Sequence, residues 1–147
     1  MTEPADDARA LFREAQARHA AHDIAASIAL TKRALALDPD YVEALEHLGM
    51  IEVSRRQHFD EGLELLRRAV DLRPDDAGLW YSLGWCCEFA ADALRRSPAG
   101  RAPTAHDLYR RAAEAFRRCL NRGPTGKLAD DAADLLALVE DRLADAP

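Results

Sequence analysis

The stretch that decides the fold is residues 80–87, Trp-Tyr-Ser-Leu-Gly-Trp-Cys-Cys. Its pattern, Trp80-x2-Leu83-Gly84-x2-Cys87, is followed by Ala112-x3-Phe116 and then by Pro124. The same order of residue types occurs earlier, as Leu45-x2-Leu48-Gly49-x2-Glu52, Gly62-x3-Leu66, Ala69 and Pro74. Each copy ends on a proline, which cannot continue the hydrogen-bond ladder of a helix. The spacing therefore predicts two similar helical units that follow one another along the chain.

A more divergent copy precedes these two and reads Leu11-x2-Glu14-Ala15-x2-Arg18, Ser27-x3-Thr31, Ala34 and Pro39. Pro39 and Pro74 are 35 residues apart. The repetition resembles the tetratricopeptide repeat (TPR) family, whose period is about 34 residues. The resemblance covers about residues 8–124 and implies an all-α, right-handed α-solenoid of three helix pairs. Its peptide-binding surface would be the concave face, lined by the first helix of each pair.

Composition and local pattern agree with helices throughout. Hydrophobic residues make up 48% of the chain and are mostly Ala and Leu, which favour helices over strands. We expect helices at about 5–20, 23–37, 41–55, 59–72, 76–96, 104–122 and 126–145, with Asp23, Asp40, Asp75 or Asp76, and Thr104 as N-caps. The chain then forms a single TPR domain, 1–147, with repeats at about 8–41, 42–75 and 76–124 and a capping helix at 126–145.

The third repeat carries an insertion. Ala15 and Ser27 of the first repeat are 12 residues apart, whereas Gly84 and Ala112 are 28 apart, an excess of 16 residues. Apolar residues continue at helical spacing on both sides of a turn at residues 97–103, which predicts a third pair with both helices lengthened into a projecting hairpin. A flexible 16-residue loop is the alternative.

The distribution of charge limits the choice of partner. The formal net charge is −6, which disfavours nucleic acid. Residues 95–122 nevertheless hold eight Arg, and the segment 127–147 is acidic. Either these two helix faces are solvated and attract each other, or the Arg-rich face meets an acidic partner. We expect no membrane association and a cytoplasmic location, since no apolar run approaches about 18 residues and the N-terminal residues are acidic.

Residues with catalytic or metal-binding patterns are not found in the sequence. Cys86 and Cys87 are adjacent and lack a Cys-x2-Cys or His-x3-His companion, so we expect buried core thiols and no zinc. No glycine-rich phosphate loop or nucleophile motif occurs. We therefore expect no enzyme activity, no catalytic residues and no cofactor.

Transferring the resemblance to this sequence gives the expected peptide-binding residues. They are Phe12, Gln16, His19, Glu43, Glu46, His47, Met50, Val53, Tyr81, Ser82, Trp85, Glu88 and Phe89. Trp85 is the most informative, because it points about 140° away from Trp80, the residue at the structural position of the repeat. Large aromatic residues often anchor interfaces, so Trp85 either contacts the partner or is buried under the C-terminal helix or the hairpin.

The predicted function is a protein- or peptide-binding adaptor. Some TPR proteins hold a carboxyl terminus with a clamp of Lys, Asn and Arg, but the comparable positions here are Phe12, Gln16, His47, Gly78 and Ser82. With an apolar, acid-flanked groove, a hydrophobic or basic protein segment is the expected partner. The alternatives are a small chaperone for a secreted or unstable client, and a scaffold that self-assembles into a homo-oligomer.

Overall fold

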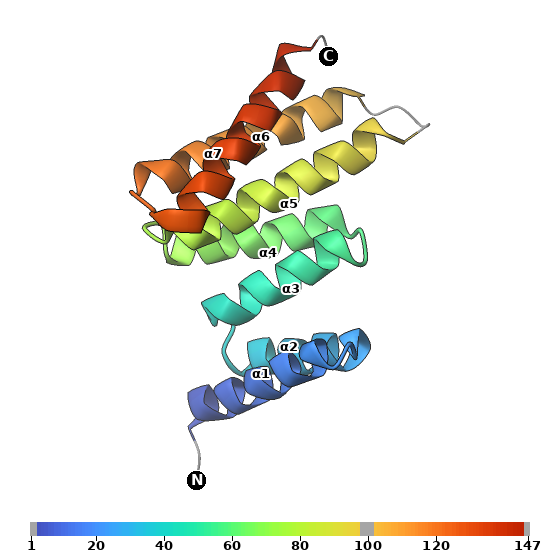
Figure 1. Ribbon diagram of the computed structural model, residues 1–147. Helices are drawn as coiled ribbons and strands as arrows, with labels where there is room; N and C mark the ends of the chain where they lie inside the picture. The colour runs from blue at the N-terminus through green and yellow to red at the C-terminus, as the bar shows by residue number, and fades with distance from the viewer. Residues whose placement is uncertain (1–2, 98–101, 146–147) are drawn as a thin grey trace.

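The computed structural model describes residues 3–97 and 102–145, and these form a stack of antiparallel helices. The helices are α1 (Pro4–Ala20), α2 (Ile24–Leu37), α3 (Val42–Ser54), α4 (Phe59–Leu72), α5 (Ala77–Arg95), α6 (Ala102–Asn121) and α7 (Gly126–Ala144). In Figure 1 the stack runs from α1 at the bottom to α7 at the top, with the termini at opposite ends. Among the described residues, no helix is both long and apolar enough to cross a bilayer.

The helices pack in sequence order as three pairs and a final helix. The most extensive contacts join α1 to α2, α3 to α4 and α5 to α6, and α7 packs on α6 and, less extensively, on α5. The first helices also meet across the stack, since α3 contacts α5. This is the predicted all-α solenoid of three helix pairs closed by a C-terminal helix.

Helix ends match the predicted ranges closely, but two predicted caps are wrong. Asp23 accepts a hydrogen bond from the Ala26 amide at 3.1 Å, and Asp76 accepts one from the Leu79 amide at 3.2 Å, as N-caps should. Asp40 does not cap α3, because the helix begins one residue later, with Tyr41 at the N-cap position. Thr104 lies inside α6, which begins at Ala102.

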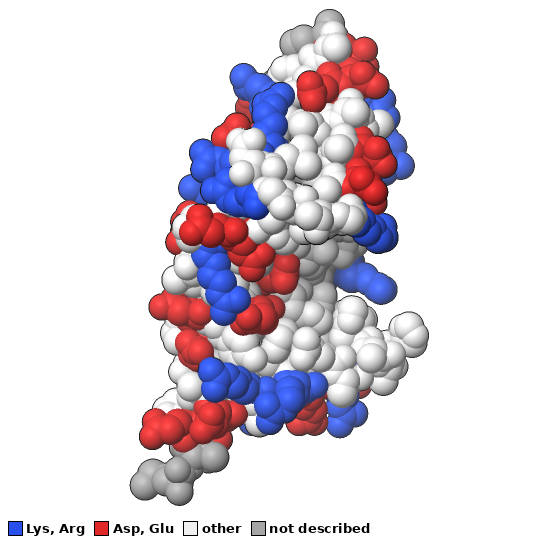
Figure 2. Space-filling model, turned by 60° about the vertical axis from the view of Figure 1, so that its left-hand side comes forward, with Lys and Arg blue, Asp and Glu red and all other residues white. Residues whose placement is uncertain are grey.

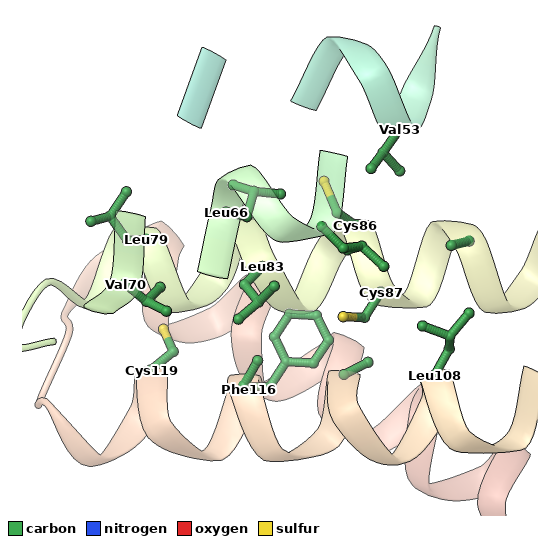
Figure 3. Close-up of a cluster of buried hydrophobic side chains, with 14 of the residues drawn as sticks. Val53, Leu66, Val70, Leu79, Leu83, Cys86, Cys87, Leu108, Phe116 and Cys119 are labelled. Carbon is green, nitrogen blue, oxygen red and sulfur yellow. The ribbon is translucent and has the colours of Figure 1, made fainter. Parts of the chain in front are cut away.

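The core of the third pair is built around Phe116, which is fully buried. Figure 3 shows its ring extending from α6 toward Leu83 and Cys87 of α5. A Cβ atom at Gly84 would lie 2.7 Å from Cε1 of this ring, so only glycine leaves room for it. The small residue in the TPR-like motif therefore sets how closely α5 approaches α6.

The second pair uses two glycines for the same purpose. A Cβ atom at Gly49 would lie 2.9 Å from the Gly62 carbonyl oxygen, and one at Gly62 would lie 2.8 Å from the Gly49 carbonyl oxygen. The backbones of α3 and α4 are therefore nearly in contact at this crossing.

The helices of the third pair are longer than those of the second. Helix α5 has 19 residues and α6 has 20, compared with 13 in α3 and 14 in α4. The last residue of α5, Arg95, is joined to the first half of α6, where its Nε donates to the Tyr109 hydroxyl at 3.2 Å. The inserted residues are thus helical up to Arg95 and again from Ala102, while residues 98–101 of the predicted turn lie outside the described residues.

Candidate functional site

The first helices of the pairs enclose a hollow of about 520 Å³ on their side of the stack. Helices α1, α3 and α5 all contribute to its lining, which consists of Phe12, Gln16, His19, Glu43, Glu46, His47, Met50, Ile51, Ser54, Arg55 and Ser82. We call it the concave hollow. Figure 2 shows a recessed, mainly uncharged surface on the right of the molecule, with both acidic and basic side chains at its border.

Aromatic and imidazole rings form the α1 side of the concave hollow. The His47 ring lies edge-on to both Phe12, at 5.5 Å between centroids, and His19, at 5.1 Å. His47 Nε2 is 3.0 Å from the Ser27 hydroxyl, whose proton goes to the Ala15 carbonyl at 2.8 Å. Burial, together with the neighbouring His19, lowers the pKa of His47. This imidazole is therefore held in a fixed position and is predominantly neutral at neutral pH.

Polar and sulfur-containing side chains form the α3–α5 side. The Ser82 hydroxyl donates to Glu46 Oε2 at 2.6 Å, and Cys86 Sγ lies 3.4 Å from Met50 Sδ. Burial raises the pKa of Glu46, so this carboxylate is incompletely solvated where it faces the hollow. A positively charged group beside Glu46 would offset the free-energy cost of burying its charge.

The structure brings together eight of the thirteen predicted groove residues. Those eight are Phe12, Gln16, His19, Glu43, Glu46, His47, Met50 and Ser82. The prediction for Val53 is wrong, because its side chain is fully buried and one of its methyl groups would be 2.6 Å from a Cβ at Gly62. Because α3 and α4 cross closely, the Val53 side chain is buried in the core against α4. The remaining four, Tyr81, Trp85, Glu88 and Phe89, lie on α5 outside the concave hollow.

Trp85 is neither freely exposed nor enclosed. Its ring is partly buried and stacks on Phe89 with 5.4 Å between centroids and 23° between planes. Charges on α7 act on the same stretch of α5: Arg142 counteracts the burial that raises the pKa of Glu88, and Asp131 adds to the burial that raises the pKa of Tyr81. Helix α7 therefore runs beside this part of α5, and the role of Trp85 in binding stays a prediction.

Sequence reasoning missed Ile51, Ser54 and Arg55, which complete the lining. Ser54 could have been found, since it follows Met50 by one helical turn and donates to the Met50 carbonyl at 2.7 Å. Arg55 lies just beyond the end of α3, where helical periodicity no longer applies.

A second group that the sequence did not reveal lies at the α3–α4 turn. Ligand atoms of Glu52, His58 and Glu61 all lie within 4.8 Å of one another. The Glu52 carboxylate is buried and already accepts hydrogen bonds from Arg56 at 2.8 Å and from His58 at 2.7 Å. Its oxygens are therefore engaged by the protein, and the group acts as a polar clamp on the turn.

Three helix pairs, a concave hollow lined by the first helices and a closing seventh helix define an α-solenoid of the TPR type. No protein-family model and no curated protein sequence matches the chain. Among solved structures, it is similar to the first TPR domain of Spaghetti (RPAP3) bound to an HSP90 peptide, with a TM-score of 0.74 and 15% identity over 96% of both chains.

Two other structures give the same result. The N-terminal domain of stress-induced protein-1 from C. elegans matches with a TM-score of 0.60 and 17% identity, covering 92% of this chain and 98% of that one. MamA matches with a TM-score of 0.54 and 18% identity, covering 94% and 81%. The chain therefore has the TPR fold.

Proposed function

We propose that the protein binds a segment of another polypeptide in the concave hollow and acts as an adaptor. The observation that carries the proposal is the hollow itself, about 520 Å³ in volume, open between three helices and lined by both apolar and acidic side chains. The similar TPR domain of RPAP3 was solved with an HSP90 peptide bound, which supports a peptide as the kind of ligand.

The chemistry of the hollow favours an apolar segment that carries Lys or Arg. Met50 and Phe12 offer apolar contacts, and Glu46 presents an incompletely solvated carboxylate. Glu43 is less available, since it accepts a hydrogen bond from Arg73 at 2.8 Å. A basic side chain of the partner would form a charge-assisted hydrogen bond with Glu46, the stronger class of hydrogen bond.

An acidic carboxyl-terminal peptide fits this hollow poorly. Arg55 is the one Lys or Arg side chain among the described lining residues, and Glu43 and Glu46 outnumber it. The HSP90 peptide Ser-Arg-Met-Glu-Glu-Val-Asp, which is bound in the RPAP3 structure, supplies a direct negative comparison. We expect this peptide to bind more weakly than an apolar, basic peptide of the same length.

The test is fluorescence anisotropy with two labelled peptides, the HSP90 peptide and a heptapeptide of alternating Leu and Lys. Met50→Ala should weaken binding of the Leu/Lys peptide about fivefold. Glu46→Gln should weaken it roughly tenfold, because the charge-assisted hydrogen bond to a Lys of the peptide is lost. Leu138→Ala is the matched control, since Leu138 is 42% exposed on α7 and lies outside the hollow.

Two results would contradict the proposal. One is binding that survives both Met50→Ala and Glu46→Gln. The other is an equal loss in the Leu138→Ala control. Light scattering over a dilution series separates partner binding from self-assembly, which would give a mass that rises with concentration.

A further inference from the structure

A second hollow of about 410 Å³ lies on the other side of α5, between α4 and α6. Its lining consists of Arg67, Val70, Asp71, Trp80, Leu83, Cys87, Arg110, Arg111, Glu114, Ala115 and Arg118. We call it the arginine hollow. Its walls come from second helices of the pairs, whereas the concave hollow is lined by first helices, and no residue lines both.

The floor of the arginine hollow is apolar and fixed. Val70, Leu83, Cys87 and Ala115 are buried core residues. The Trp80 indole donates its Nε1 proton to the Pro74 carbonyl at 2.7 Å, which sets the plane of the ring. The guanidinium groups of Arg118 and Arg122 lie 5.0 and 5.3 Å from the ring centroid. A pre-formed apolar floor can accept one side chain of a ligand with little reorganisation.

Two of the four guanidinium groups at the rim have no acidic partner in the described part of the chain. Arg110 pairs with Asp107, and Arg118 pairs with Glu114 at 2.8 Å. Arg67 on α4 and Arg111 on α6 both line the hollow and make no ion pair or side-chain hydrogen bond within the described residues. Asp71 is the one acidic side chain of the lining besides Glu114.

The acidic C-terminal helix does not neutralise this rim. Its Asp131 pairs with Lys127 of the same helix at 2.6 Å, and no ion pair joins an Arg of α6 to an acid of α7 in the described part of the chain. That these two solvated faces attract each other stays a prediction. The arginine side chains remain directed to the solvent around an apolar floor.

We propose that the arginine hollow binds an acidic segment of a partner protein, with one apolar side chain on the apolar floor beside Trp80 and carboxylates on Arg67 and Arg111. Charge complementarity selects this occupant, because four arginines against two acids line the hollow. Arginine presents a planar fork of donors that matches a carboxylate in bidentate geometry. This partner has the opposite charge from the one expected in the concave hollow, so the two surfaces bind different segments.

The probe is a fluorescein-labelled peptide, Glu-Glu-Leu-Glu-Glu, whose binding is followed by anisotropy at low and moderate salt. Arg67→Gln and Arg111→Gln should each weaken binding roughly tenfold, the loss expected for one charge-assisted hydrogen bond. Arg117→Gln is the matched control, because Arg117 has the same charge and is exposed on α6 but does not line the hollow. It should change the affinity less than about twofold, as expected for an exposed charge outside the site.

Peptide variants give an independent test that does not depend on the folding of a protein variant. Replacing the central Leu by Ser should weaken binding, and replacing Glu by Gln should abolish it. Equal losses in Arg67→Gln and Arg117→Gln, or equal binding of the Ser peptide, would indicate diffuse charge attraction and overturn the proposal. Tighter binding of single-stranded RNA than of the peptide would also overturn it.

One further variant separates this proposal from the concave site. Met50→Ala should leave binding of the acidic peptide unchanged, because Met50 lines only the concave hollow. If Met50→Ala abolished binding of the acidic peptide, the ligand would be in the concave hollow and the arginine hollow would lose its assignment.

Discussion

Gly84→Ala tests how the sequence sets the geometry of the α5–α6 pair, which lines much of the arginine hollow and contributes Ser82 to the concave hollow. The added methyl group would lie 2.7, 2.8 and 3.0 Å from three atoms of the Phe116 ring. Phe116 is fully buried, so its ring can move only by displacing other core atoms. Overpacking of this kind costs about 1–3 kcal/mol, offset by a gain of up to about 1 kcal/mol in helix propensity. We expect a net loss of about 1–2 kcal/mol in the free energy of unfolding and a decrease of roughly 2–8 °C in Tm.

The assay is denaturant unfolding followed by far-ultraviolet circular dichroism, with Phe116→Leu as the compensating change. Phe116→Leu alone should cost roughly 1–2 kcal/mol in lost buried contacts. In the double variant the smaller side chain makes room for the new methyl group. Its loss in the free energy of unfolding should therefore be about 1 kcal/mol smaller than the sum of the losses of the two single variants. Gly78→Ala is the control, since a Cβ there meets only the Asp76 carboxylate, at 3.2 Å. Full additivity, together with a Gly84→Ala effect no larger than that of the control, would refute the reasoning.

Three further outcomes follow from buried groups. Burial raises the pKa of the Cys87 thiol to about 11 and also raises that of Cys86, so mass spectrometry should find both cysteines unmodified by iodoacetamide until the chain is unfolded. Burial lowers the pKa of His47 in the folded protein. The neutral imidazole therefore contributes fully to stability above the unfolded pKa of about 6.5, and this contribution is lost as the pH falls toward the pKa of the folded state. His47→Asn should flatten the pH dependence of the unfolding free energy between about pH 7.5 and about pH 5. Arg56→Ala removes one partner of the buried Glu52 and should cost about 1–2 kcal/mol in urea unfolding, whereas Arg55→Ala, which makes no ion pair in the described part of the chain, should stay within about 0.5 kcal/mol.

The fold could be predicted from the sequence because its determinants recur at fixed spacing. Gly49 and Gly84 each lie at a close helix crossing, and the helices begin and end within a few residues of the expected positions. Repetition makes such predictions strong, since each repeat tests the others. The caps at Asp40 and Thr104 failed because capping depends on which residue has non-helical dihedral angles, a property that one residue of shift changes.

The candidate site was less predictable because it depends on contacts between repeats. The positions of Phe12, His47 and Ser82 were expected from the resemblance to the TPR family, and the structure places them around one hollow. Val53 was expected from the same resemblance but is buried at the Gly49–Gly62 crossing, a consequence of a neighbouring helix. The arginine hollow could not be foreseen from the eight arginines alone, because Arg67 lies outside that segment and only packing places it in the same hollow as Arg111.

Helix α5 explains why one small stack can present two surfaces of opposite charge. Its two tryptophans differ in environment: Trp80 lines the arginine hollow, and Trp85 stacks on Phe89 beside α7. Ser82 of the same helix reaches the concave hollow through its hydrogen bond to Glu46. The Phe116 contact at Gly84 holds α5 against α6, so both surfaces are fixed relative to each other. We therefore expect a partner bound on one side to meet a scaffold already ordered for the other, and we expect the opposite charges of the two rims to keep each segment from occupying the wrong site.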